Sequence, residues 1–185
     1  SAELAALYQP IAAGVSWAHR VPGTKIGDTV VIFGAGQRGI ACALAAREAG
    51  AAHVAVIARR QSAHRLKLAE EFGADATIYA DEDVLGRVRE LTRGEGADVV
   101  VDVTAETMAP IAQAVEMARP GGTIILAGVK GPAAAIPDLK NDRIFSKELT
   151  IRGVKNADFD SFAIAVKLIE AHKYPFEKMH THSFA

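Results

Sequence analysis

Short apolar runs rich in β-branched residues alternate along this chain with helical stretches of about ten residues, and this alternation limits the folds open to it. The runs are continuously apolar, which is typical of strands covered on both faces. Strands that alternate with helices are joined by right-handed crossovers into a parallel sheet. The sequence therefore predicts an α/β fold: a doubly wound, parallel, six-stranded sheet with helices on both faces.

The boundaries of the predicted elements come from the apolar runs and from residues that start and stop helices. Strands are predicted at residues 29–33, 53–57, 76–79, 99–103, 122–126 and 149–152. Helices are predicted at residues 40–49, 62–72, 83–91, 108–117 and 159–171, with Ser62 as an N-cap. One or two short helices are expected within residues 2–20, where Pro10 and Gly14 interrupt the pattern, and residues 131–137 are expected to form a loop.

No internal repeat, low-complexity tract or linker divides the sequence. Its 185 residues fit one domain of ordinary size that buries a single core. We therefore predict one domain over residues 1–185, in which residues 1–24 form a leading segment before the first strand.

Charge and cysteine content limit the expected partners. The chain has 21 Lys and Arg against 22 Asp and Glu, so it lacks the basic surface of a general nucleic-acid binder or a polybasic membrane binder. Cys42 is the single cysteine, which excludes an internal disulfide and a cysteine-rich zinc site. No apolar run approaches the roughly 20 residues of a membrane span, and the first residues do not resemble a signal peptide. A cytoplasmic protein that binds neither nucleic acid nor membrane is expected.

The sequence Gly-Ala-Gly-Gln-Arg-Gly at residues 34–39 is a G-x-G-x-x-G motif that directly follows the first predicted strand and opens a helix. In a dinucleotide site of the Rossmann type, Gly34 permits the tight turn and Gly36 lets the backbone approach a pyrophosphate. Gly39 allows the helix to pack closely on the strand, and the amides of the helix N-terminus bind phosphate. The alternative is a tight turn that binds no ligand.

About 20 residues further on, at the end of the second strand, such sites carry an acid for the adenosine ribose. This chain has Ala-Arg-Arg-Gln-Ser at residues 58–62, so no carboxylate is available there. The guanidinium groups of Arg59 and Arg60 are bidentate partners for a 2′-phosphate. We therefore favour NADP over NAD, with the alternative that one or both arginines are only solvated.

Several other features support no catalytic or metal-binding assignment. Tyr174 and Lys178 have the spacing of a short-chain dehydrogenase pair, but Pro175 would break the helix that must carry both. His180 and His182 alternate near the chain end without an apparent third metal ligand. Cys42 lies in an alanine-rich helix and is expected to be a core residue. No catalytic residue and no metal ligand are predicted in this chain.

Five segments, in order, make the chain resemble the medium-chain, zinc-type alcohol dehydrogenases. They are residues 25–39, 65–75, 96–102, 119–128 and 149–153. The resemblance covers nearly the whole chain but only the second half of a typical member, the cofactor-binding domain. It implies a nicotinamide cofactor and, in the parent enzyme, hydride transfer between NAD(P) and an alcohol or carbonyl substrate that zinc polarises.

The resemblance also implies the residues that contact the cofactor. The pyrophosphate is expected at Gly34, Gly36, Gln37, Arg38 and Gly39. The adenosine ribose and any 2′-phosphate are expected at Arg59, Arg60 and Arg65. The nicotinamide side is expected at Val103, Thr104 and Ala105, at the backbone groups of Ala127, Gly128 and Val129, and near Arg152. Asp102 ends a buried strand and is expected to be structural or to act through a neighbour.

The family's catalytic domain, which supplies a cysteine and a His-Glu pair around zinc, has no counterpart in this sequence. We therefore expect an isolated cofactor domain, cut at both ends and inactive alone, with any zinc in the missing domain. Gln9 stands where members often carry another zinc ligand, and an amide is a poor one. A zinc-free quinone or enoyl reductase of the same superfamily, or a nucleotide-sensing module without catalysis, are therefore alternatives.

The predicted strand Leu149 to Arg152 is also a candidate edge strand. Exposed edge strands pair readily with another chain, and dimers of the family typically join there. A homodimer through these residues is therefore a hypothesis.

Overall fold

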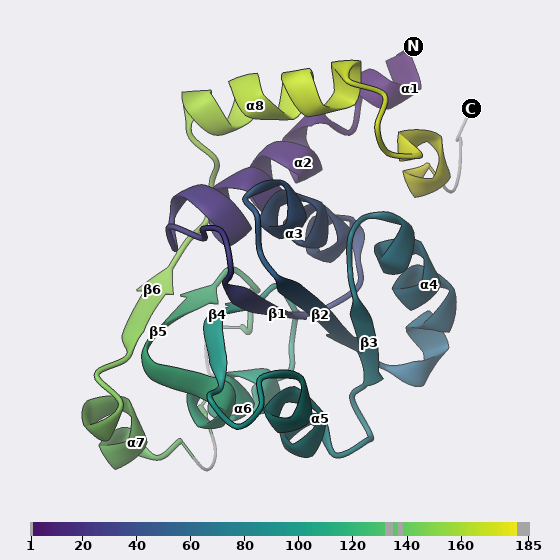
Figure 1. Ribbon diagram of the computed structural model, residues 1–185. Coiled ribbons are helices and arrows are strands. Elements are labelled where there is room, and N and C mark those ends of the chain that lie inside the picture. Colours follow the sequence, from purple (N-terminus) through teal and green to yellow (C-terminus); the bar gives the residue numbers. More distant parts are fainter. Residues whose placement is uncertain (1, 132–134, 137–138, 181–185) are drawn as a thin grey trace.

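A computed structural model describes residues 2–131, 135–136 and 139–180. Within these ranges six strands form one parallel sheet, in the order β3-β2-β1-β4-β5-β6 (Figure 1). They are β1 (Thr29–Phe33), β2 (His53–Ala58), β3 (Ala76–Tyr79), β4 (Ala97–Asp102), β5 (Ala118–Leu126) and β6 (Thr150–Gly153). The predicted fold class is confirmed. Because the strand order reverses between β1 and β4, ligands are expected at the carboxyl ends of these two strands.

Helices cover both faces of the sheet. One face carries α3 (Gln37–Glu48) and α4 (Ala63–Glu71), and the other carries α5 (Val84–Leu91) and α6 (Ala109–Met117). Figure 1 shows α2 (Tyr8–Val15) lying over α3, and α8 (Phe159–Glu170) lying over α2. The sheet is therefore the middle layer, with a deeper stack of helices on the α3 side.

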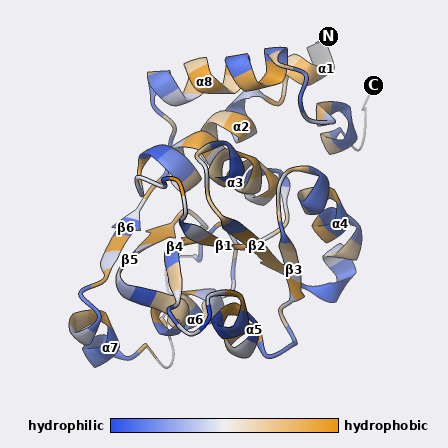
Figure 2. Cartoon of the chain, viewed as in Figure 1, coloured by the Kyte–Doolittle hydropathy of each residue, from blue (hydrophilic) through white to orange (hydrophobic). Residues whose placement is uncertain are grey.

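The strands of the sheet are buried because each contributes to two cores. In β1, Val30 and Ile32 belong to the core on the α3 side, whereas Val31 and Phe33 belong to the core on the α5 side. All five residues of β1 are buried. Figure 2 shows the apolar character of β2 in the middle of the molecule and the polar outer turns of α4. This burial explains why the strands are continuous apolar runs in the sequence.

The leading segment contains two short helices, as predicted, but the expected interruptions are absent from the second one. Pro10 and Gly14 were expected to interrupt it, but both lie inside α2, which continues directly into a π-helical turn, η1 (Ser16–Arg20). Pro10 is tolerated because it lies in the first turn of the helix, where backbone N–H groups have no intrahelical partner. A β-carbon on Gly14 would lie 2.3 Å from the carbonyl carbon of Ala41, so this glycine allows α2 to pack closely on α3.

Three short elements were not predicted: η2 (Arg60–Ser62), α7 (Asn141–Ser146) and η3 (Phe176–Met179), while α1 (Ala2–Ala5) falls within the leading segment. Ser62 precedes α4 as predicted, but its side chain makes no capping hydrogen bond with the described residues. The 3₁₀ turn η2 supplies the start of this helix instead.

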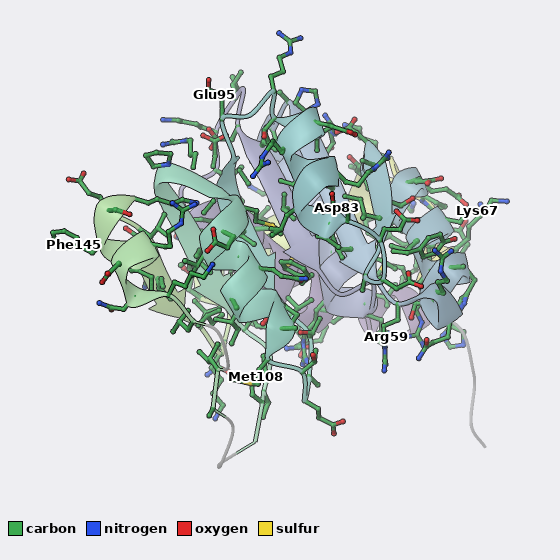
Figure 3. All side chains as sticks on the ribbon, turned by 90° about the horizontal axis from the view of Figure 1, so that it is seen from below. Arg59, Lys67, Asp83, Glu95, Met108 and Phe145 are labelled. Carbon is green, nitrogen blue, oxygen red and sulfur yellow. The ribbon has the colours of Figure 1, made fainter. Side chains whose placement is uncertain are left out.

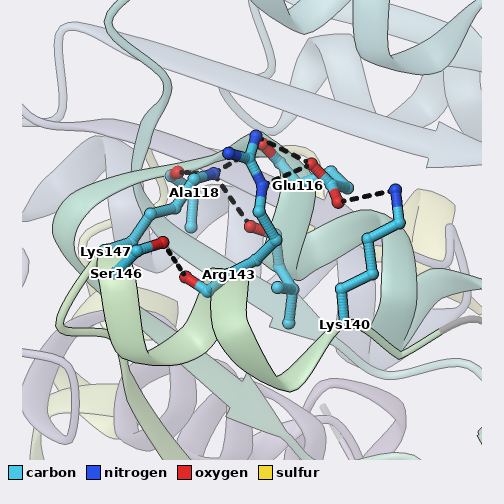
Figure 4. Close-up of polar contacts among 7 residues, drawn as sticks. Glu116, Ala118, Lys140, Arg143, Ser146 and Lys147 are labelled. Carbon is cyan, nitrogen blue, oxygen red and sulfur yellow. Dashed lines mark hydrogen bonds and ion pairs between the residues drawn. The ribbon is translucent and has the colours of Figure 1, made fainter.

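Polar contacts anchor α7 to the end of α6 (Figure 4). The Lys147 ammonium donates to the carbonyl oxygens of Val115, Glu116 and Ala118 at 2.9, 2.7 and 2.7 Å. Arg143 Nη2 lies 3.1 Å from Glu116 Oε2. Lys147 therefore satisfies two carbonyl groups that α6 leaves without intrahelical partners, and the carbonyl of the first residue of β5. None of the described helices has the length and apolar character that a membrane span requires.

Candidate functional site

The glycine-rich turn lies between β1 and α3, at the carboxyl edge of the sheet. Gly34 has a φ of +109°, in the region that favours glycine, and its N–H donates to the Ile57 carbonyl at 2.8 Å. Gly36 precedes the first residue of α3, and a β-carbon built on it would meet no described atom within 4 Å. A β-carbon on Gly39 would lie 1.8 Å from the Gly34 carbonyl oxygen. The turn is therefore closely packed on the protein side and open at Gly36.

A cavity of about 650 Å³ lies beside this turn. It is lined by Gln9 and Pro10 of α2, Ala35 to Ile40, five residues of α4 (His64, Arg65, Lys67, Leu68 and Glu71), Val103, and Lys178 and Met179 of η3. The lining contains four cationic side chains, those of Arg38, Arg65, Lys67 and Lys178. They share the cavity with the N-terminus of α3, whose free N–H groups also attract anions. This arrangement suits a phosphate-containing ligand.

Two of these cations have partners within the protein. Arg38 lies with its guanidinium carbon 5.8 Å from the centre of the Trp17 ring, and Lys178 forms an ion pair with Glu71. Among the described residues, Arg65 and Lys67 have no hydrogen bond or ion pair through their side chains. Both are exposed on α4 and remain available to a ligand.

The arginines after β2 lie in a different environment from the one the sequence suggested. No carboxylate neighbours them in the sequence, but the loop after β3 brings two: Asp81 Oδ2 lies 2.7 Å from Arg60 Nε, and Glu82 Oε1 lies 3.7 Å from Arg60 Nη2. The Arg60 guanidinium also lies 4.4 Å from the centre of the Tyr79 ring. The Asp81 hydrogen bond raises the pKa of Arg60. Arg60 is thus paired rather than only solvated.

Arg59 is exposed, and no hydrogen bond or ion pair holds its side chain within the described part of the chain. Figure 3 shows it extending from the molecule on the same side as Met108, opposite Glu95. Of the two arginines, Arg59 is the one for which the described residues supply no competing partner.

The predicted nicotinamide side is formed by the loops that follow β4 and β5. The N–H groups of Ala127 and Gly128 both donate to the Asp102 carbonyl, at 2.9 and 3.0 Å, and Glu106 N–H donates to the Val129 carbonyl at 3.1 Å. Val129 is 80% exposed. These bonds hold the two loops against each other at the carboxyl edge of the sheet.

Beneath these loops lies a polar cluster that the sequence did not reveal. Asp102 is fully buried, and Lys130 Nζ lies 2.7 Å from its Oδ2 atom. Thr104 donates to Asp102 Oδ1 through its N–H at 2.9 Å and through its hydroxyl at 2.6 Å. The prediction that Asp102 is structural or acts through a neighbour agrees with these contacts, but no motif marked Lys130.

The structure brings some of the predicted site residues to one cavity and leaves others outside it. The cavity is lined by Gly36, Gln37, Arg38, Gly39, Arg65 and Val103. Outside its lining lie Gly34, Arg59, Arg60, Thr104, Ala105, Ala127, Gly128, Val129 and Arg152, the last exposed on β6 opposite Ile125. His64, Lys67 and Glu71 lie at successive helical turns of α4. Their i, i+3 and i+7 spacing places them on one face, but they are not at helical spacing from the predicted Arg65, so the prediction missed them. Gln9 reaches the cavity only through the packing of α2.

The remaining sequence features have structural roles. The Tyr174 hydroxyl donates to Glu48 Oε1 at 2.5 Å, and burial raises its pKa. Burial raises the pKa of the Cys42 thiol to about 12, as expected for a core residue. Within the described residues no group of three His, Cys, Asp or Glu side chains could hold a metal ion. His182 lies outside the described residues.

The reversed strand order and the open glycine turn before α3 define an α/β domain of the Rossmann type. Comparison with known proteins then assigns the family: the model of the zinc-binding dehydrogenase family matches residues 38–171, and the chain belongs to that family. This is the family that the resemblance to the zinc-type alcohol dehydrogenases indicated.

Similar proteins extend well beyond this chain. A Mycobacterium tuberculosis protein named "Probable alcohol dehydrogenase adh" is 40% identical over 181 residues, which are 97% of this chain and 49% of that protein. L-threonine 3-dehydrogenase of Bacillus licheniformis is 31% identical over 189 residues, 95% of this chain and 52% of that protein. The chain spans about half the length of these relatives.

Solved structures agree with this assignment. A crystal structure of an alcohol dehydrogenase from Thermotoga maritima has a TM-score of 0.80 and 32% identity, covering 92% of this chain and 47% of that one. A putative zinc-binding dehydrogenase from Sinorhizobium meliloti, solved bound to NADP, has a TM-score of 0.80 and 28% identity. The match covers 95% of this chain and 50% of that one.

Proposed function

We propose that this chain binds a nicotinamide dinucleotide as the cofactor domain of an alcohol dehydrogenase-like oxidoreductase, which transfers hydride between NAD(P) and an alcohol or carbonyl substrate. The observation that carries the proposal is the open space at Gly36, at the N-terminus of α3 and beside a cationic cavity. A pyrophosphate approaching Gly36 meets free N–H groups of the helix and no side chain.

The residues present fit such a cofactor along its length. In this proposal Gly34, Gly36, Gln37, Arg38 and Gly39 hold the pyrophosphate. Arg65 borders the adenosine ribose, and Lys67 of α4 adds positive charge beside it. Residues 103–105 and 127–129 border the nicotinamide half, with Arg152 at the same end. The bound nicotinamide would supply the hydride acceptor or donor, and this chain's residues would orient it.

We favour NADP over NAD because an unpaired arginine follows β2. Arg59 has no competing partner among the described residues, and Arg60 lies close by with its guanidinium stacked on Tyr79. A 2′-phosphate would have to share Arg60 with Asp81. The NADP found in the Sinorhizobium meliloti protein belongs to that protein, but it is consistent with this preference.

A second function, a zinc-free quinone or enoyl reductase of the same superfamily, is favoured by one observation. Gln9, which stands where the resemblance places a metal ligand, is exposed and lines the cavity. The described residues do not fit a zinc ion, so no step is assigned to zinc here. A nucleotide-sensing module is the non-catalytic alternative.

The domain organisation is part of the same proposal. Residues 1–185 form one nucleotide-binding domain, a separate catalytic domain supplies the remaining active-site groups, and two copies join through β6. Cytoplasmic location stays a prediction from the sequence.

Titration of the 185-residue chain with NADPH and NADH, followed by nicotinamide fluorescence, tests the proposed function. Trp17, the single tryptophan, lies next to Arg38 and provides a second signal by energy transfer to bound nicotinamide. We expect tighter binding of NADPH than of NADH. Equal affinities would remove the NADP preference only, whereas binding of neither would contradict the proposed function.

A further inference from the structure

The side chain of Lys130 is directed into the protein rather than into solvent. It follows β5 by four residues and is 11% exposed, beside an Asp102 side chain that is 0% exposed. Burial of a charged group is unfavourable unless the charge is paired and its hydrogen bonds are satisfied. The surroundings of this ammonium group therefore call for an explanation.

Three residues pair the two charges with each other. Lys130 Nζ lies 2.7 Å from Asp102 Oδ2, 2.6 Å from the Thr104 carbonyl oxygen and 2.8 Å from Thr104 Oγ1. The ammonium group donates hydrogen bonds to the two Thr104 oxygens, whereas its contact with Asp102 Oδ2 is an ion pair, and this buried oxygen accepts no hydrogen bond from the described residues. The Thr104 hydroxyl and N–H both donate to Asp102 Oδ1. The result is a connected network in which Lys130 joins the end of β4 to the loop after β5.

This network lies directly under the two loops. Gly128 packs so closely on Thr104 that a β-carbon on it would lie 1.8 Å from the Thr104 carbonyl oxygen, the atom that Lys130 also holds. None of the three network residues lines the cavity beside the glycine-rich turn. The network therefore acts on one half of the site, the half formed by residues 103–105 and 127–129.

We propose that Lys130 is a positioning residue for the nicotinamide half of the cofactor: through Asp102 and Thr104 it sets the relative position of the loops after β4 and β5. The inference rests on the proposed function. It assigns Lys130 no contact with the cofactor. Without its ammonium group, the Thr104 carbonyl and the Asp102 carboxylate lose their shared partner, and the two loops lose their link below the surface.

The test compares ligands that differ only in the nicotinamide. Each variant is titrated with NADPH and with 2′-phospho-ADP-ribose, which keeps the adenosine and pyrophosphate groups. Lys130→Met is expected to weaken NADPH binding about tenfold, which corresponds to about 1.4 kcal/mol of binding free energy. Binding of 2′-phospho-ADP-ribose is expected to change less than twofold, or less than about 0.4 kcal/mol. The matched control is Lys25→Met, which removes an exposed lysine before β1, at the opposite edge of the sheet.

A second variant separates positioning from the effect of an unpaired buried carboxylate. The double variant that combines Lys130→Met with Asp102→Asn removes the charge from both partners. Its folding stability, measured by thermal melting, should therefore recover relative to Lys130→Met alone. The selective loss of NADPH binding should remain because the link between the loops is still missing.

Three results would overturn the inference. They are equal weakening of both ligands, unchanged NADPH binding in Lys130→Met, and restored NADPH binding in the double variant. A wild-type chain that binds neither ligand would instead overturn the proposed function, and this inference with it. That outcome is visible before any variant is compared.

Discussion

The carbonyl oxygen of Gly34 lies where a side chain on Gly39 would have to begin: a β-carbon on Gly39 would be 1.8 Å from it. Three residues before Gly39, Gly36 has no described atom within 4 Å of the corresponding position, and its φ of −73° is open to any residue. One glycine of the motif is therefore required by the protein's own packing, whereas the other leaves space that the protein does not use.

This difference predicts opposite results for two alanine substitutions. Gly39→Ala should lower the free energy of unfolding by about 1–3 kcal/mol or more, because the turn is overpacked. Gly36→Ala should leave stability nearly unchanged but weaken NADPH binding by at least about tenfold, because the methyl group occupies the proposed pyrophosphate position. Urea denaturation and nicotinamide fluorescence measure the two effects. Full NADPH binding by a folded Gly36→Ala variant would contradict the proposed site.

Because Asp81 pairs with Arg60, we predict that the Asp81 carboxylate limits NADPH affinity. Asp81→Asn frees Arg60, so NADPH affinity should rise by a factor of about two to five, the scale of an exposed ion pair. NADH affinity should not change. Glu95→Gln is the control, since it removes one negative charge on the opposite side from Arg59 (Figure 3). If both variants raise NADPH affinity equally, the effect is one of net charge and the assignment of Arg60 is wrong.

Asp158 predicts an acid-sensitive link between the leading segment and α8. Its carboxylate accepts from the Ser161 N–H at 2.8 Å and pairs with Arg20, whose other partner is Asp160. The contact with Ser161, followed by Arg20, lowers the pKa of Asp158 from 3.8 to about 2. A carboxyl with a lowered folded pKa stabilises the fold above its unfolded pKa, and this contribution is lost as the pH falls from about 4 through about 2.

Urea midpoints of the wild type and of Asp158→Asn, measured from pH 7 to pH 2, test this link. The difference between them should be constant down to about pH 5 and should shrink towards zero near pH 2. A difference that does not depend on pH would show that the ionised form of Asp158 contributes nothing to stability.

We predict that removing the Lys147 ammonium group alone lowers the free energy of unfolding. Lys147→Met leaves three carbonyl oxygens near the end of α6 without their donor, which should cost about 1–3 kcal/mol in the free energy of unfolding. Lys140→Met serves as a matched control because Lys140 is 68% exposed and only pairs with Glu116 at 3.5 Å. It should cost less than about 1 kcal/mol. Equal losses would show that the ion pair with Glu116, and not the capping of α6, anchors α7.

The edge strand β6 predicts association of two copies. All four of its residues are exposed, and Ile151 presents an apolar side chain there that is 38% exposed. Light scattering at high protein concentration should therefore give the mass of a dimer, and Ile151→Lys should give a monomer. Val166→Lys on α8, a site of similar exposure at 45%, should not change the mass. A wild-type monomer would count against the homodimer.

Sequence reasoning succeeded where a single local pattern decides the structure. The continuous β-branched run at residues 29–33 predicted β1 to the residue, because a strand buried on both faces has no polar position. It failed for α7, which has six residues and is held by Lys147 and Arg143 contacts with α6. Helices of this length depend on tertiary contacts that no local pattern records.

By itself the sequence determined the parallel α/β fold, the glycine turn before α3 and the family resemblance, because all three depend on the order of residues along the chain. The tertiary structure alone decided that Asp81 neutralises Arg60, that Gln9 reaches the cavity, and that Lys130 pairs with Asp102. These partners come from separate elements of the chain. Only when the sheet and its helices are packed do their charges come close enough to interact, since such interactions depend on distance and burial and not on separation along the chain.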